Sequence, residues 1–222
     1  MMPVIDSFTI YHSPNAYLGI ELARRVFADI PVTHRRRPIF IPRARGVRVA
    51  DLVGGHESKA RASYHREDCL RWARRHRVPL HLIEPEEFER RATRWKASAF
   101  EREELPARAF YAAQELGGGA AMDQALFAAA WVLRRDVNDE GVIRDAATAA
   151  GLDADSVLER ACAVAAGQQA QEALAAFESL QCPGVPTFVW AGQRYWGKDR
   201  VDEVAADVCA ARRATTGGSS ST

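Results

Sequence analysis

The chain has 222 residues, of which 47% are hydrophobic and 27% charged, and this composition is typical of a globular protein that folds as one domain or as one domain with an insertion. Its 30 basic and 29 acidic residues give a formal net charge of +1, which argues against binding to nucleic acid or to an anionic membrane surface. No apolar run is long enough to span a bilayer and no secretory signal is visible, so we expect a cytoplasmic protein.

The first part of the chain predicts a β-α-β unit. Residues 8–12 (FTIYH) are mostly β-branched or aromatic and precede a turn signal, which indicates a buried strand. Apolar residues then recur at helical spacing over residues 14–28. Residues 32–41 (VTHRRRPIFI) predict a second strand, whose proline favours the edge of a sheet.

Ser13 and Pro14 stand where the first strand gives way to the first helix. A serine before a proline is typical of a helix N-cap, and a plain cap without a ligand is one interpretation. In a thioredoxin-like chain this corner carries Cys-x-x-Cys, but here the two cysteine positions are Ser13 and Ala16. Because the positive end of a helix dipole stabilises a thiolate, the corner is also suited to a sulfur supplied by a ligand, with a hydrogen bond from the Ser13 hydroxyl.

Alanine, glutamate, arginine and leucine dominate from about residue 47 to residue 180, which predicts a block of helices. Asp153 is a plausible N-cap within this block. The predicted helices cover residues 58–77, 106–116, 122–135, 139–150, 153–165 and 167–180.

Strand character returns near the C-terminus. Residues 187–191 (TFVWA) and 194–197 (RYWG) flank a turn and predict a hairpin, and a last helix is expected over residues 199–213. Just before the hairpin, Pro186 marks either a turn or a cis peptide bond at a special corner, and an ordinary trans proline is the more common case.

The predicted fold class is α/β, with a thioredoxin-like fold and an inserted all-helical domain. Residues 1–46 and 181–214 would form the discontinuous thioredoxin-like domain, and residues 47–180 would form the insertion. Residues 215–222 (TTGGSSST) would form a flexible tail.

The four cysteines are too scattered in the sequence to form a metal-ligand or redox pair, so we expect no metal. Scattered free thiols also suit a reducing cytoplasm. Cys182, beside a Pro-Gly turn, is interpreted as structural. The cysteines are Cys69, Cys162, Cys182 and Cys209.

Three motifs resemble the family of kappa-class glutathione transferases and 2-hydroxychromene-2-carboxylate isomerases, in the DsbA-like branch of thioredoxin folds. They are SPNAYLG at residues 13–19, GVPTF at 184–188 and RYWGKDRVDEV at 194–204, and a looser similarity runs from Arg61 through residues 64–80. The resemblance extends from residue 8 to about residue 211. It implies a homodimer and a small aromatic substrate.

The resemblance also implies glutathione, or another low-molecular-weight thiol, as cofactor. Ser13 would stabilise its thiolate, and the backbone of Val185, ahead of a cis Pro186, would pair with the glutathione peptide. Further cofactor contacts would come from Arg61, Lys198 and Asp199, of which Asp199 and its neighbours would hold the γ-glutamyl end.

The sequence departs from the family pattern at several positions. Family members often carry an aromatic residue and a second serine where Asn15 and Ala16 stand, and an asparagine where Lys198 stands. The ligand-contacting asparagine expected before the first inserted helix is not evident in residues 53–57 (VGGHE).

Other residues near these motifs have simpler interpretations. Tyr64 and Trp72, at helical spacing, are expected in the core. Arg61 is compatible with a solvated helix face, and Asp199 with a plain helix cap. His12 can change charge near neutral pH, but alternation along a strand sends adjacent side chains to opposite faces, so a catalytic role is not the preferred interpretation.

The expected function is a glutathione-dependent cis-trans isomerase of the 2-hydroxychromene-2-carboxylate type, acting in aromatic-compound metabolism. The thiolate beside Ser13 would add reversibly to a conjugated substrate, permit rotation and leave. The alternatives are a kappa-like glutathione transferase and a non-catalytic thioredoxin-like protein that binds a thiol or peptide. A disulfide oxidoreductase is disfavoured, because Ser13 and Ala16 cannot supply the thiolate that exchange requires.

Overall fold

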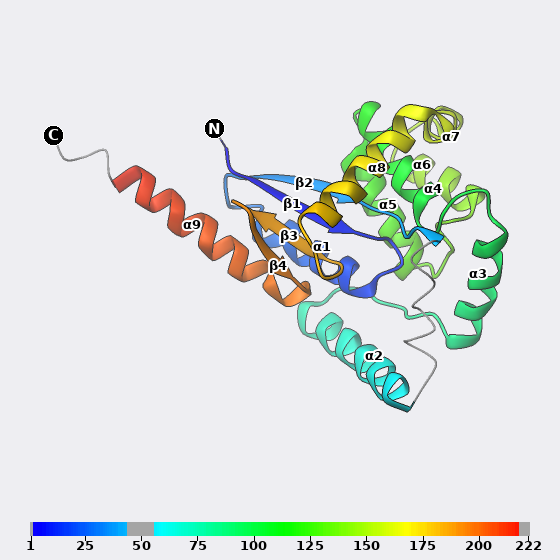
Figure 1. Ribbon diagram of the computed structural model, residues 1–222, viewed down its shortest axis with the longest axis horizontal. Coiled ribbons are helices and arrows are strands. Elements are labelled where there is room, and N and C mark those ends of the chain that lie inside the picture. Colours follow the sequence, from blue (N-terminus) through cyan, green and yellow to red (C-terminus); the bar gives the residue numbers. More distant parts are fainter. Residues whose placement is uncertain (1, 44–55, 218–222) are drawn as a thin grey trace.

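The computed structural model describes residues 2–43 and 56–217, with side chains for residues 2–43 and 60–214 (Figure 1). A four-stranded sheet lies beside a group of helices, and the C-terminal helix extends away from it (Figure 1). Within the described ranges, no helix combines the length and apolar character that a bilayer crossing requires.

The sheet has the strand order β2-β1-β3-β4 and combines parallel with antiparallel pairing. β1 (Val4–Thr9) is parallel to β2 (Thr33–Pro38) and antiparallel to β3 (Thr187–Trp190), which forms a hairpin with β4 (Gln193–Trp196). The predicted hairpin is confirmed, and so is the edge position of the second strand, where a proline without an N–H group is tolerated.

β1 ends earlier than the sequence predicts. The aromatic run over residues 8–12 predicts a strand, whereas the structure places Tyr11 and His12 in a turn. The backbone N–H groups of both residues donate hydrogen bonds to the carboxylate of Glu103, at 2.7 and 3.0 Å. A tertiary contact therefore overrides the local strand propensity of the run.

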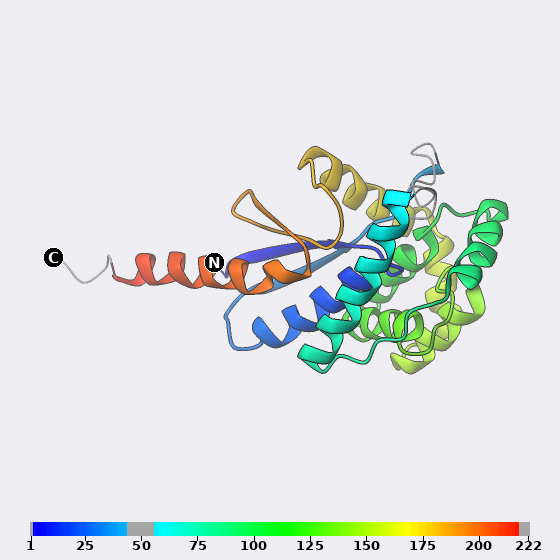
Figure 2. The same cartoon turned by 90° about the horizontal axis from the view of Figure 1, so that it is seen from below.

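Helices cover both faces of the sheet (Figure 2). α1 (Pro14–Val26) and α9 (Val201–Gly217) contact each other, and α9 packs on β3 and β4. α8 (Val164–Ser179) lies on the opposite face, where the ring of Phe177 packs against Phe8 with centroids 5.7 Å apart. The start of α1 is thus held at the end of a sheet that is covered on both faces.

The last helix begins with a 3-10 turn, η3 (Lys198–Arg200), and continues as α9 to Gly217. It extends beyond residue 215, where the sequence predicts the start of a tail, and residues 218–222 lie outside the described part of the chain. The predicted domain boundary between residues 46 and 47 lies outside it as well.

The described chain between β2 and β3 is helical, as the composition predicts. Asp153 caps α7 as predicted, and its carboxylate accepts a hydrogen bond of 2.8 Å from the Ser156 N–H group. α3 has no counterpart among the predicted helices. The insertion consists of α2 (His56–His76), α3 (Pro85–Ala97), α4 (Glu104–Glu115), α5 (Gly119–Trp131), α6 (Glu140–Ala149), α7 (Ala154–Cys162) and α8.

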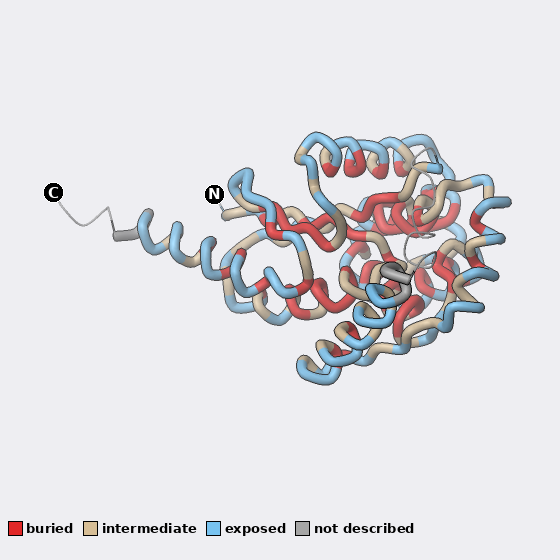
Figure 3. The backbone as a smooth tube through the Cα atoms, turned by 60° about the horizontal axis from the view of Figure 1, so that its bottom comes forward, coloured by how far each residue is buried: buried red, intermediate tan, exposed pale blue. Residues whose placement is uncertain are grey.

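Buried hydrophobic residues form one continuous cluster that includes both the sheet and the insertion. Figure 3 shows the buried parts of the backbone in red. The rings of Tyr11 and Tyr17 pack on Phe127 of α5, with ring centroids 4.8 and 5.7 Å apart. The insertion therefore packs directly on the turn after the first strand and on α1.

Candidate functional site

Ser13 caps α1, as predicted, and its Oγ atom accepts a hydrogen bond of 3.2 Å from the Ala16 N–H group. No described residue accepts a hydrogen bond from the Ser13 hydroxyl or from the backbone N–H group of Asn15. Two donors and the positive end of the helix dipole therefore lie together at this corner. Such an arrangement can stabilise a negatively charged atom such as a thiolate sulfur.

The second predicted motif meets the same helix. The Val185–Pro186 peptide bond is cis, and Pro186 is buried. A Cβ atom on Gly19, in the second turn of α1, would lie 3.0 Å from Pro186 Cγ and 3.3 Å from Lys198 Cα. The three motifs of the sequence thus converge on α1, and the absence of a side chain at Gly19 permits this close approach.

Val185 is half-buried, and its backbone N–H and C=O groups make no hydrogen bond to any described residue. Its neighbours are paired: the Pro186 carbonyl accepts from the Gly197 N–H group at 3.0 Å, and the Thr187 hydroxyl donates to the Gly184 carbonyl at 2.6 Å. An unpaired donor and acceptor on one residue can bind an extended peptide by strand addition.

Lys198 does not project freely toward solvent. Its side chain is buried, its Nζ atom donates to Asp68 on α2 at 2.6 Å, and it lies 5.4 Å from the centroid of the Trp72 ring. The ammonium group therefore joins the start of the last helix to α2. Asp199 is exposed and lies 3.8 Å from the Arg200 guanidinium, so its carboxylate is accessible to a ligand.

Arg61 is exposed on α2, one helical turn before His65. Residues four positions apart share a helix face, so Arg61 lies on the side of α2 that contacts α1. That contact includes a hydrogen bond of 2.9 Å from the Asn15 side-chain amide to His65 Nε2.

Asn15, His65 and Cys69 form a cluster that the sequence analysis does not predict. The Cys69 thiol donates to the Asn15 side-chain oxygen at 3.4 Å. Burial raises the pKa of Cys69 to about 11, so this thiol stays neutral and does not replace the missing thiolate. Burial and the Lys198 charge lower the pKa of His65, which agrees with an unprotonated Nε2 atom that accepts from the amide.

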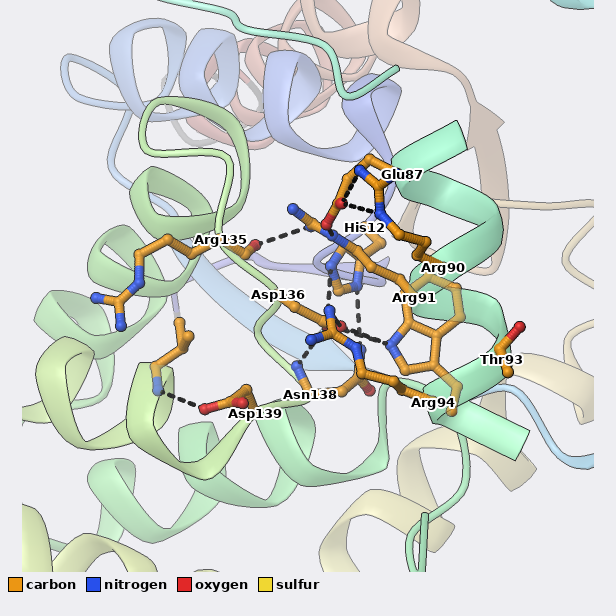
Figure 4. A network of polar contacts seen from close by, with 12 residues as sticks. His12, Glu87, Arg90, Arg91, Thr93, Arg94, Arg135, Asp136, Asn138 and Asp139 are labelled. Carbon is orange, nitrogen blue, oxygen red and sulfur yellow. Dashed lines mark hydrogen bonds and ion pairs between the residues drawn. The ribbon is translucent and has the colours of Figure 1, made fainter. Parts of the chain in front are cut away.

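His12 faces the helical insertion (Figure 4). Its Nδ1 atom contacts a Glu103 carboxylate oxygen, its Nε2 atom lies 3.5 Å from Asp136 Oδ1, and its side chain is only 4% exposed. The expectation that rests on strand alternation does not apply, because β1 ends at Thr9. His12 is therefore part of a buried polar network.

Two expectations about the core have different outcomes. Trp72 is partly buried, packs against the core and lies 4.4 Å from the His76 ring, measured between centroids. Tyr64, in contrast, is 61% exposed, so the prediction that it packs in the core is wrong. Regular helical spacing indicates a shared face but does not show how far a neighbouring element covers it.

The comparisons with known proteins establish the family. The sequence profile of DSBA-like thioredoxin domains matches residues 4–208, and the chain belongs to the DSBA-like thioredoxin domain family. Its fold is a thioredoxin-like α/β fold with the helical insertion α2–α8 between β2 and β3, as the sequence predicts. No curated protein matches the sequence significantly.

Several solved structures share this fold. A 2-hydroxychromene-2-carboxylate isomerase has a TM-score of 0.71 and 21% identity, over 98% of this chain and 100% of its own. A probable DsbA oxidoreductase from Streptomyces coelicolor has a TM-score of 0.70 and 16% identity, over 94% and 90% of the two chains. The cytosolic disulfide reductase DsbM from Pseudomonas aeruginosa, solved with GSH, has a TM-score of 0.61 and 16% identity, over 95% and 99%.

Proposed function

We propose that the protein is a glutathione-dependent cis-trans isomerase of the 2-hydroxychromene-2-carboxylate type. The observation that carries this proposal is the unpaired backbone of Val185 beside the cis Pro186, which packs close to α1, the helix that Ser13 caps where a thioredoxin-like chain has a cysteine. The similarity to a 2-hydroxychromene-2-carboxylate isomerase and to a reductase solved with GSH supports it.

The described residues offer chemical groups that suit those of a glutathione molecule. The Val185 backbone offers a donor and an acceptor to its peptide, and the Ser13 hydroxyl and Asn15 N–H group can donate to its sulfur. The exposed Asp199 carboxylate suits the ammonium group of the γ-glutamyl end, and Arg61 suits a carboxylate. Because Lys198 is paired with Asp68, we assign it the role of holding Asp199 in place.

When bound, the thiol supplies reversible nucleophilic addition to a conjugated double bond, which permits rotation about that bond. Ser13 holds the sulfur as thiolate through its hydroxyl proton, and the amino end of α1 lowers the energy of the charge. Val185 fixes the cofactor backbone and thereby orients the reacting atom. Because the thiol that adds to the substrate would also depart from it, the thiol would be regenerated, and the overall isomerisation would involve no net oxidation or reduction.

The test combines thermal melting with an absorbance assay of chromene interconversion. We expect glutathione to raise the melting temperature, because a ligand that binds only the folded state stabilises it, by about 2.7 kcal/mol at a concentration of 100 Kd. We expect Ser13→Ala to lower turnover at saturating thiol by roughly 10- to 100-fold, because it removes a hydrogen bond to the sulfur.

Ser13→Ala also removes a helix cap, which costs about 1 kcal/mol of stability. Asp153→Ala is the matched control, because it removes the cap of α7 and leaves the corner at Ser13 intact. Binding of glutathione without isomerisation would leave a thiol-binding protein, and release of the adduct as product would indicate a transferase. Indifference to every small thiol would refute the proposal.

A further inference from the structure

Glu103 is a fully buried glutamate that contacts the turn leading into the candidate site. One of its carboxylate oxygens, Oε2, accepts hydrogen bonds from the N–H groups of Tyr11 (2.7 Å) and His12 (3.0 Å). The other oxygen, Oε1, contacts His12 Nδ1. One side chain of the insertion therefore binds the two residues that precede Ser13.

The charge of this carboxylate is stabilised by its partners. Burial alone raises the pKa of Glu103, but the charges of His12 and Arg102 and the hydrogen bonds from His12 outweigh burial and lower it to about 2. Loss of these donors would leave a buried carboxylate unpaired, at a large cost in folding free energy. The hydrogen bonds therefore fix the position of the turn relative to Glu103.

Glu103 is itself held firmly. Its backbone lies in the left-handed region with φ 69°, and its N–H group donates to Asn138 Oδ1 at 2.8 Å. Asn138 in turn donates to Asp136, which also accepts from the Trp95 indole at 3.1 Å (Figure 4). Residues from α3 and from the segment between α5 and α6 thus support the glutamate.

The insertion also binds the carbonyl side of the turn. The Trp131 indole N–H group donates to the Tyr11 carbonyl at 2.7 Å, and the Tyr11 hydroxyl donates to Asp123 at 3.0 Å. The Ser13 N–H group points back to the Ile10 carbonyl at 3.4 Å. The backbone just before Ser13 is therefore held by side chains of the insertion.

We propose that Glu103 is a positioning residue of the thiol site, which sets the place of the Ser13 hydroxyl by holding the backbone of Tyr11 and His12. This inference rests on the proposed function, because it concerns the group that holds the cofactor sulfur. The helical insertion would then contribute to catalysis through the position of Ser13, since a displacement of the reacting groups by about 1 Å can cost 100-fold in rate.

The test distinguishes the effect of side-chain length from that of charge, with three variants of the 222-residue chain. Glu103→Gln keeps the length and one oxygen that can accept both backbone N–H groups, and its amide can donate to Nδ1 of a neutral His12 ring. Glu103→Asp keeps the charge but is one methylene shorter. Glu103→Ala keeps neither. Glu104→Gln is the matched control, because Glu104 pairs with Arg108 and does not contact the turn.

Turnover is measured at saturating glutathione, well below each variant's melting temperature, together with KM for glutathione. We expect Glu103→Gln to stay within about threefold of the unmodified protein and Glu103→Asp and Glu103→Ala to lose roughly 10- to 100-fold in turnover. Glu104→Gln should match the unmodified protein. If Glu103→Ala does not fold, the comparison of Glu103→Gln with Glu103→Asp still decides the question.

Three results would overturn the inference: full turnover in Glu103→Asp, equal losses in Glu103→Gln and Glu103→Asp, or lower melting temperatures with unchanged turnover. The last result would mean that Glu103 supports the fold only. If the unmodified protein neither binds glutathione nor isomerises the chromene, the proposed function fails, and that outcome is distinct from a failure confined to the Glu103 variants.

Discussion

Gly19 lies where α1, the cis Pro186 and the start of the last helix come closest together. A Cβ atom at this position would meet both Pro186 Cγ and the Lys198 backbone at distances tighter than ordinary packing. The proline ring is buried and the other contact is to backbone, so neither neighbour can move easily. The spacing between α1 and the loop before β3 therefore depends on one absent methyl group.

Gly19→Ala should destabilise the protein by about 1–3 kcal/mol, because the added methyl group overpacks this junction. The measurement is the free energy of unfolding in urea. Gly167→Ala, in α8, is the control, since its new methyl group would meet the flexible end of the Arg108 side chain, 2.7 Å away at Nη2. We expect the control to be neutral or stabilising, and equal losses in both variants would contradict the account of Gly19.

At the scale of elements, the sequence predicts what local chemistry determines and misses what distant contacts determine. The caps Ser13 and Asp153 carry local signals, and both are confirmed. α3 is mostly charged and has few apolar residues, and its Trp95 donates a hydrogen bond to Asp136, which lies 41 positions later.

In the candidate site, too, the sequence predicts the residues that carry local motifs and misses the contacts between distant residues. Ser13 and Pro186 stand in recognisable motifs, and the cis bond before Pro186 agrees with the resemblance. The hydrogen bond between Asn15 and His65 joins residues 50 positions apart, and that between His12 and Glu103 joins residues 91 positions apart. Contacts of this kind are set by packing of whole elements, and no local pattern reports them.

β2 contributes a pH-dependent term to stability through His34. Burial, together with the Arg36 charge, lowers the pKa of His34 from 6.5 to about 3, and its Nε2 atom lies 2.8 Å from the Ser7 hydroxyl. Because the folded state favours the neutral ring, this contribution is present above pH 6.5 and is lost as pH falls toward 3.

We expect the free energy of unfolding to fall by up to about 1.4 kcal/mol per pH unit through this group below pH 6.5. His34→Gln should flatten the dependence between about pH 6.5 and 5, above the range where most carboxylates titrate. Urea denaturation across this interval measures both slopes. Identical slopes in the two proteins would show that His34 does not stay neutral in the fold.

At the scale of the whole molecule, the site is assembled from parts that lie far apart in the chain. The first strand and helix, the insertion and the C-terminal hairpin and helix all contribute, and the bond between Lys198 and Asp68 joins the last helix to α2. The same fold occurs in a probable DsbA oxidoreductase, and at the corner where a thioredoxin-like chain carries its cysteine pair this chain has Ser13 and Ala16.

Ser13→Cys tests the electrostatics of this corner without any cofactor. We expect the pKa of the new thiol to lie at least one unit below the ordinary value of about 8.5, because α1 stabilises the thiolate. Its titration is followed by thiolate ultraviolet absorbance as a difference from the unmodified protein. The double variant Ser13→Cys/Ala16→Cys should gain insulin reductase activity. A thiol with an ordinary pKa would contradict the proposed role of the helix end.

An oxygen atom at residue 13 also changes how this corner responds to oxidative damage. Catalytic cysteines can be converted irreversibly to sulfinic or sulfonic acids, which inactivates the protein that carries them, whereas the Ser13 hydroxyl offers oxidants no sulfur to attack. Under the proposed function, an oxidised thiol molecule would leave and a fresh one would take its place, so recovery would depend on the supply of thiol rather than on synthesis of new protein.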